Sequence, residues 1–187
     1  MDLRPATLSD IPALQTLIDA SARALSAGYY TDAQIEAAAT HVFGVDSQLI
    51  RDGTYYVIEA VGQPIAAGGW SARRTLYGGD QMKDGEDPRL DPATEAARIR
   101  AFFVHPAWTR RGLARRSYDT CSDAAWRAGF RRFELMSTRP GEPLYLALGF
   151  VAVEPVVRRL PGDVDVEFTR MSRAIDSLVE RRDIPGG

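Results

Sequence analysis

The chain has 187 residues, of which 45% are hydrophobic, so we expect one globular domain with a sizeable core. Its net charge of -2 and pI of about 5.7 argue against nucleic acid or an anionic membrane as a partner. A single cysteine argues against an intramolecular disulfide, and with only two histidines there is no zinc-binding spacing. The sequence has no signal-peptide pattern and no apolar run long enough to span a membrane. We therefore expect a cytoplasmic protein without a bound metal.

The first 71 residues predict two helices and three strands. Residues 3–7 suit a short strand, and Asp10 and Pro12 begin an amphipathic helix whose apolar stripe extends to Leu25. A break at residues 28–30 precedes a second short helix over 35–41, opened by a capping pattern at Thr31. Residues 54–61 and 65–71 predict a hairpin, in which Gly68 and Gly69 indicate a bulge or a close backbone approach.

Residues 76–94 are polar and rich in glycine, aspartate and proline, which predicts a long loop. Long loops inside compact domains are commonly functional lids or disordered insertions, and we interpret this one as a mobile loop, with simple disorder as the alternative. Residues 176–187 are charged and end in Pro-Gly-Gly, so we expect a flexible tail after a domain that spans residues 1–175.

Residues 95–128 read as a strand, a tight basic turn and the start of a helix. The β-prone run 99–104 ends at His105-Pro106, and a helical pattern begins near Arg111. The N–H groups of a first helical turn lack intrahelical partners, and Gly112 lets a bulky ligand approach the backbone. Four arginines add positive charge, so this turn predicts a pyrophosphate site: Arg110, Arg111, Arg115 and Arg116.

A second strand over 131–138 follows this helix, so the two strands are expected to be parallel. A short helix over 142–148 and two further strands over 150–158 and 164–171 complete the predicted sheet.

Two motifs resemble those of the GNAT-type N-acetyltransferases. After a strand ending in Val-His-Pro, residues 109–114 resemble the family's acetyl-CoA-binding pattern of Gln or Arg, two residues, Gly, one residue, and Gly or Ala, with Thr109 in the first position. Residues 144–150 resemble its Phe-Tyr-x-x-Leu-Gly-Phe, with Leu144 replacing the first aromatic residue.

The resemblance implies an α/β, single-domain GNAT-like fold with a mixed, mostly antiparallel sheet of about six or seven strands, a central parallel splayed pair and flanking helices. It implies acetyl-CoA as the acyl donor, a small-molecule amine or peptide acceptor, and direct transfer to a primary amine. The implied cofactor-binding residues are Phe103, Val104, Thr109, Arg110, Arg111, Gly112, Leu113, Ala114 and Arg115. It also makes Tyr29 and Tyr30 candidates for substrate contact and Tyr145 the candidate proton donor to the leaving thiolate.

A general base is less well indicated. Glu95 and Glu59 are the two candidates, and either could instead be an exposed charge at the end of a strand. Backbone N–H groups near Val104 are expected to hold the oxyanion, and Cys121 is interpreted as a packed thiol rather than a nucleophile.

Two other functions stay open at this point. The same motifs would suit a CoA-binding sensor or degenerate domain without transferase activity. A dinucleotide-binding Rossmann domain is disfavoured because G-x-G-x-x-G is absent. A homodimer is compatible with the sequence, and nothing in it identifies the acceptor amine.

Overall fold

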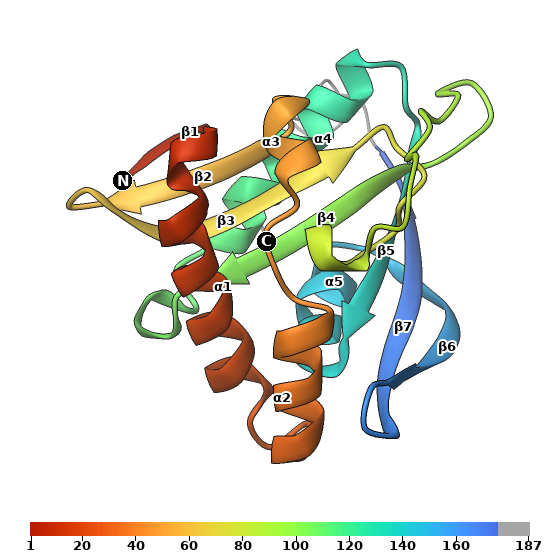
Figure 1. The fold of residues 1–187 in the computed structure, drawn as a ribbon. Coiled ribbons are helices and arrows are strands. Elements are labelled where there is room, and N and C mark those ends of the chain that lie inside the picture. The colour runs from red at the N-terminus through yellow and green to blue at the C-terminus, as the bar shows by residue number, and fades with distance from the viewer. Residues whose placement is uncertain (176–187) are drawn as a thin grey trace.

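A seven-stranded mixed sheet forms the centre of the computed structural model, which describes residues 1–175 (Figure 1). The order across the sheet is β1-β2-β3-β4-β5-β7-β6. The strands are β1 (Asp2–Pro5), β2 (Tyr55–Ala60), β3 (Gln63–Ser71), β4 (Ala97–Val104), β5 (Arg132–Thr138), β6 (Val151–Leu160) and β7 (Val164–Ala174). All neighbouring pairs are antiparallel except β4 and β5, which confirms the predicted fold class.

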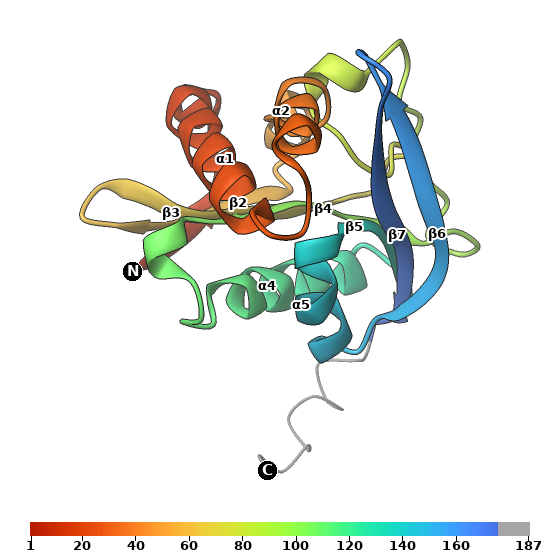
Figure 2. The ribbon, with the colours of Figure 1, turned by 90° about the horizontal axis from the view of Figure 1, so that it is seen from below.

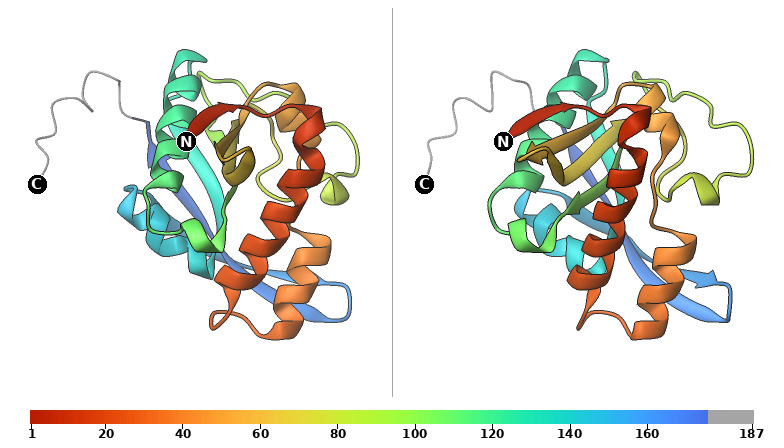
Figure 3. Two further views of the ribbon diagram at one scale, coloured as in Figure 1. Left: turned by 90° about the vertical axis from the view of Figure 1, so that its left-hand side faces the viewer. Right: turned by 60° about the vertical axis from the view of Figure 1, so that its left-hand side comes forward.

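Helices cover both faces of this sheet. They are α1 (Ile11–Ser26), α2 (Asp32–His41), α3 (Ser47–Arg51), α4 (Leu113–Arg127) and α5 (Glu142–Ala147). Figure 2 shows α1 and α2 on one face and α4 and α5 on the other, and Figure 3 shows α1 running across the sheet beside α2. The predicted tail over 176–187 lies outside the described residues.

Local sequence accounts for the helix starts that were predicted and for the one that was not. The hydroxyl of Thr31 accepts a hydrogen bond from the Gln34 N–H at 3.3 Å, and the Gln34 side chain accepts one from the Thr31 N–H at 2.9 Å. Helix α3 was not predicted. It has five residues, too few for a helical period, and it is capped by Asp46, which accepts from the Gln48 N–H at 3.0 Å.

The parallel strands β4 and β5 separate soon after they begin. Their pairing is limited to Ala97 with Phe133 and Arg98 with Glu134, whereas β5 pairs with β7 along its whole length. Beyond Arg98, the edge of β4 that faces β5 therefore has no strand partner. This confirms the splayed central pair and opens the sheet in its middle.

A bulge in β4 lies at the edge of this opening. The register between β3 and β4 shifts between Ala67 and Gly69, and Ala101 has a φ of 51°. The Tyr55 hydroxyl donates to the Ala101 carbonyl oxygen at 3.1 Å, and this hydrogen bond stabilises the bulge. A Cβ at Gly68 would collide with the Phe102 ring, so the close approach expected at this glycine is confirmed.

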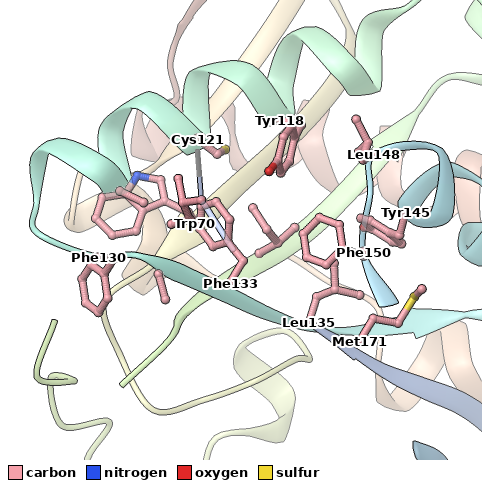
Figure 4. Packing of buried hydrophobic residues seen from close by; sticks show 14 of the residues in the cluster. Trp70, Tyr118, Cys121, Phe130, Phe133, Leu135, Tyr145, Leu148, Phe150 and Met171 are labelled. Atoms are coloured by element: carbon pink, nitrogen blue, oxygen red, sulfur yellow. The ribbon is translucent and has the colours of Figure 1, made fainter. Parts of the chain in front are cut away.

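The main apolar cluster lies between α4 and the sheet (Figure 4). Cys121 is fully buried in it, and burial raises the pKa of its thiol well above the ordinary value, which agrees with a packed cysteine. Tyr145 lies at one end of the cluster, with its ring 5.6 Å from that of Phe150 and 6.4 Å from that of Phe102. The core thus extends directly to the opening between β4 and β5.

The loop over residues 76–94 packs beside the segment that joins α2 to α3. Its Gly79 N–H donates to the Val42 carbonyl and its Asp80 N–H donates to the Val45 carbonyl, both at 3.0 Å. A short 3-10 turn at Asp80–Met82 lies between these anchors and the rest of the loop. Its predicted mobility stays a prediction, and the contacts place the loop on the α1 and α2 face.

Candidate active site

A cavity of about 840 Å³ runs through the opening between β4 and β5. Residues 99–104 of β4 form one wall. Residues on the α1 and α2 face include Ser21, Leu25 and Phe168, and residues on the α4 and α5 face include Leu144 and Tyr145. Because the strands are not paired here, one continuous space joins the two faces of the sheet, and its size is typical of ligand sites.

The first turn of α4 meets this cavity with unpaired amides. The first hydrogen bond of the helix runs from the Arg116 N–H to the Gly112 carbonyl oxygen, so the N–H groups of Leu113, Ala114 and Arg115 precede it. Gly112 has a φ of 75°, and a Cβ there would meet no atom within 4 Å. The backbone is therefore exposed to a ligand at the positive end of the helix dipole.

The four arginines of the turn divide into two pairs. Arg110 and Arg115 line the cavity, and Arg115 also donates to the Ala147 carbonyl at 3.3 Å, which links α4 to α5. The Arg111 guanidinium lies 4.8 Å from the centre of the Trp108 ring and does not line the cavity. Arg116 donates to the Met1 carbonyl at 3.1 Å. Only the first pair is placed to meet phosphate oxygens inside the cavity.

The remaining predicted donor-side residues have mixed surroundings. Thr109 lines the cavity, while its hydroxyl donates to the Pro106 carbonyl at 3.2 Å and stabilises the turn itself. Leu113 is buried with Ile58 and Ile65. Phe103 and Val104 both line the cavity, but the Val104 N–H donates to the Ser21 hydroxyl at 3.3 Å. An oxyanion role for that N–H would require this contact to be released.

Tyr145 lies where the cavity meets the apolar core. It is nearly buried, and burial raises the pKa of its phenol above the ordinary value of 10. Its hydroxyl makes no hydrogen bond with the described residues, although the residue lines the cavity. The phenol of Tyr145 is thus protonated, and its hydroxyl is available to hydrogen-bond a ligand in the cavity.

The two adjacent tyrosines after α1 have different environments. Tyr29 is half exposed and lines the cavity. The Tyr30 hydroxyl donates to the Glu167 carbonyl at 2.6 Å and accepts from the Arg139 N–H at 2.9 Å, and its side chain lies outside the cavity lining. Tyr30 therefore ties the α1 and α2 connection to β7, whereas Tyr29 lies at the cavity; substrate contact by either tyrosine stays a prediction.

The two candidate bases lie outside the cavity lining. Glu59 forms an ion pair with Arg4 at 2.6 Å, and Glu95 accepts from the Asp91 N–H at 2.8 Å. Each carboxylate is engaged by a neighbour on its own side of the molecule, so the structure does not bring either one to Tyr145. The described residues that line the cavity include no aspartate, glutamate or histidine.

A buried ionic group borders the cavity and was not predicted. The Arg100 side chain is 1% exposed and donates to Asp46 at 2.7 Å, to the Thr75 carbonyl at 2.8 Å and to the Gly78 carbonyl at 2.6 Å. Asp46 also pairs with Lys83. Burial lowers the pKa of Arg100, and Asp46 opposes that effect. Arg100 therefore holds the start of the 76–94 loop against β4.

Sequence reasoning also missed the residues that form the cavity on the α1 and α2 face. They come from four separate segments, with no motif that links them: Ser21, Leu25, Phe43, Tyr77 and Phe168. An aromatic residue such as Tyr77 in a glycine-rich loop was the one available signal.

These features define a class of protein before any comparison is made. A helix start with free N–H groups and two arginines, a sheet opened between two parallel strands and a protonated tyrosine beside the opening suit an enzyme or binding protein for an acyl-CoA. The sequence model of the Acetyltransferase (GNAT) family matches residues 16–150. The chain belongs to this family of acetyltransferases.

Several solved structures share the fold of this chain. A GCN5-related N-acetyltransferase from Rhodopseudomonas palustris has a TM-score of 0.68 at 18% identity, with 92% of this chain and 94% of that one covered. PaiA N-acetyltransferase from Thermoplasma acidophilum, solved with coenzyme A, has a TM-score of 0.61 at 13% identity, with 92% and 98% covered. YncA from Salmonella typhimurium, solved with its cofactor acetyl-CoA, has a TM-score of 0.59 at 17% identity, with 95% of each chain covered. No curated protein sequence matches the chain.

Within 1–175, no group of three or more histidine, cysteine, aspartate or glutamate side chains is placed to hold a metal ion. No helix in the same range is long and apolar enough to cross a bilayer.

Proposed function

We propose that this protein transfers an acetyl group from acetyl-CoA to a primary amine of a small molecule or peptide by direct attack. The observation that carries the proposal is the cavity through the sheet, because it connects the amides of α4 with the face covered by α1. A donor and an acceptor that enter from opposite faces would meet beside β4.

The donor side fits the chemistry of CoA. The free N–H groups of Leu113, Ala114 and Arg115 and the guanidinium groups of Arg110 and Arg115 suit a pyrophosphate, and the cavity lining contains no carboxylate among the described residues to repel it. Bound acetyl-CoA would supply the activated thioester. Residues 103 and 104 would bind the pantetheine arm along the unpaired edge of β4.

Tyr145 would assist departure of the thiolate. Its raised pKa keeps the phenol protonated at neutral pH, so an O–H group is available to the sulfur. Because the ordinary pKa of a thiol is about 8.5, proton transfer that left Tyr145 ionised would be unfavourable, and we expect the phenol to give its proton to sulfur only as it takes one from the attacking nitrogen. Tyr145→Phe should lower kcat about a hundredfold while the Kd for CoA stays within a factor of two.

Gly112 offers the sharpest test of the donor site. Gly112→Ala places a Cβ on the surface that faces the cavity at a φ of 75°, so we expect weaker CoA binding by calorimetry. Gly53→Ala is the matched control, since Gly53 has a φ of 69° with similarly open surroundings but does not line the cavity. Equal loss of CoA affinity in both variants would show that the effect comes from backbone strain and not from the site.

A CoA-binding sensor without transferase activity is the second candidate. The absence of a carboxylate or imidazole from the described cavity lining favours it, since a base is the usual means of deprotonating an amine. Release of free thiol when the protein meets acetyl-CoA and a panel of amines separates the two functions. Tight CoA binding with no thiol release from any amine would favour the sensor.

A further inference from the structure

The acceptor end of the cavity is apolar and aromatic, and the charged side chains that line the cavity are all basic. Its wall on the α1 and α2 face includes Tyr29, Phe43, Tyr77 and Phe168, and the rings of Tyr77 and Phe168 lie 5.7 Å apart. Such a surface binds an apolar or aromatic body well.

Every titratable or charged side chain among the described cavity lining is a tyrosine or an arginine. They are Tyr29, Tyr77, Tyr145, Arg100, Arg110 and Arg115. The carboxylate that pairs with Arg100, Asp46, is also held by Lys83 and does not line the cavity. Asp46, Arg100 and Lys83 together carry a formal charge of +1, and this positive charge disfavours a protonated amine nearby.

The proton balance of the transfer shows what this environment requires. When a neutral amine attacks the thioester, a C–N bond forms and the C–S bond breaks, while nitrogen must lose one proton and sulfur must gain one. Tyr145 can relay that proton from nitrogen to sulfur, so no added base is needed after attack. A base is needed only to convert an ammonium ion to the neutral amine beforehand.

From this arrangement we propose that the acceptor is an amine of low pKa on an apolar or aromatic body, such as the α-amino group of an apolar amino acid amide or peptide. This inference rests on the proposed transferase function. An α-amino group has a pKa of about 7.7 and an alkylamine such as the lysine side chain about 10.4, so at pH 7 the neutral fraction differs by about 400-fold. A cleft without a base has no means to recover that difference.

Matched pairs of amines test the proposal with the full chain and acetyl-CoA. Phenylalanine amide and phenethylamine share one aromatic body, and leucine amide and isoamylamine share one aliphatic body, while the amides have the lower amine pKa. We expect kcat/KM at pH 7 to be at least tenfold higher for each amide, with the difference shrinking as the pH rises to 10. The apparent pKa in each pH profile should follow that of the acceptor.

A variant that introduces a carboxylate provides the second measurement. Leu25 lines the cavity from α1 and is 37% exposed, so Leu25→Glu is compatible with the fold and Leu25→Gln is its uncharged control. We expect Leu25→Glu to narrow the preference for the amides severalfold, and Leu25→Gln to leave it within a factor of two. An unchanged preference in Leu25→Glu would contradict the proposal.

Other results would overturn the inference but not the function. Faster reaction of the alkylamines, a polyamine such as spermidine as the only substrate, or a common inflection at acidic pH for all acceptors would each contradict a cleft without a base. Absence of thiol release with every amine, while CoA still binds, would instead refute the transferase function itself.

Discussion

Breaking the buried pair between Asp46 and Arg100 should destabilise the fold strongly. Both side chains are 1% exposed, and Nη2 of Arg100 lies 2.7 Å from Oδ2 of Asp46. In Asp46→Asn the buried guanidinium keeps its charge but loses its anion, and Lys83 remains as a second cation. Removal of one partner from a buried pair costs about 3–5 kcal/mol. Asparagine can still accept from the Gln48 N–H, so the change mainly reports the loss of charge.

The opposite substitution should cost less. Arg100→Met leaves Asp46 paired with Lys83 and gives up the hydrogen bonds to the Thr75 and Gly78 carbonyls, so we expect a loss of about 1–3 kcal/mol. In the double variant no unpaired buried arginine remains, so its loss should be at least about 2 kcal/mol smaller than the sum of the two single losses.

Urea unfolding followed by circular dichroism measures this cycle, provided that the m-value is constant. For a domain of this size, Asp46→Asn should lower the Tm by roughly 10 °C. Asp165→Asn, which removes a solvent-exposed partner of Arg159, is the control and should change little. A loss below about 1 kcal/mol in Asp46→Asn, or additive single losses, would refute the account of Arg100 as a cation held by Asp46.

Three further predictions concern tyrosines and the cysteine. Tyr30→Phe should lower the free energy of unfolding, measured in urea, by about 1–3 kcal/mol without changing KM for the acceptor, because two hydrogen bonds of the hydroxyl are lost. Tyr29→Phe should leave the free energy of unfolding unchanged. The reverse pattern would contradict the structural role of Tyr30. Burial raises the pKa values of Tyr55 and Tyr145, so stability should be retained below about pH 10 and fall above it, where the unfolded chain ionises first; alkaline denaturation curves check this. Cys121 should not react with a thiol reagent in the native state, and rapid labelling without unfolding would contradict its burial.

The fold was predictable where its signals are local. The β-prone runs at 54–61 and 99–104 and the helix starts near Asp10 and Thr31 depend on neighbouring residues, and the structure places strands and helices there. Helix α3 escaped prediction because five residues cannot display a helical period. The insertion of β7 between β5 and β6 depends on packing between distant segments, which a local pattern does not encode.

The same distinction explains the site. The turn that is predicted to bind phosphate occupies consecutive positions, so its spacing could be read directly from the sequence. The cavity wall on the α1 and α2 face combines residues as distant along the chain as Ser21 and Phe168, and no pattern in the sequence connects them. The surroundings of Glu59 could not be read from the sequence either, because its ion-pair partner Arg4 lies on a neighbouring strand that is distant along the chain.

If the protein binds CoA as proposed, the short pairing between β4 and β5 links the stability of the fold to the supply of that ligand. Two residue pairs and the Arg98 to Glu134 ion pair join one half of the sheet to the other. A CoA molecule bound along the open edge would serve as an additional connection that only the folded chain can make. At a hundred times its Kd, such a ligand stabilises the native state by about 2.7 kcal/mol. The abundance of this protein in a cell would then rise and fall with the concentration of free CoA, independently of any acetyl transfer.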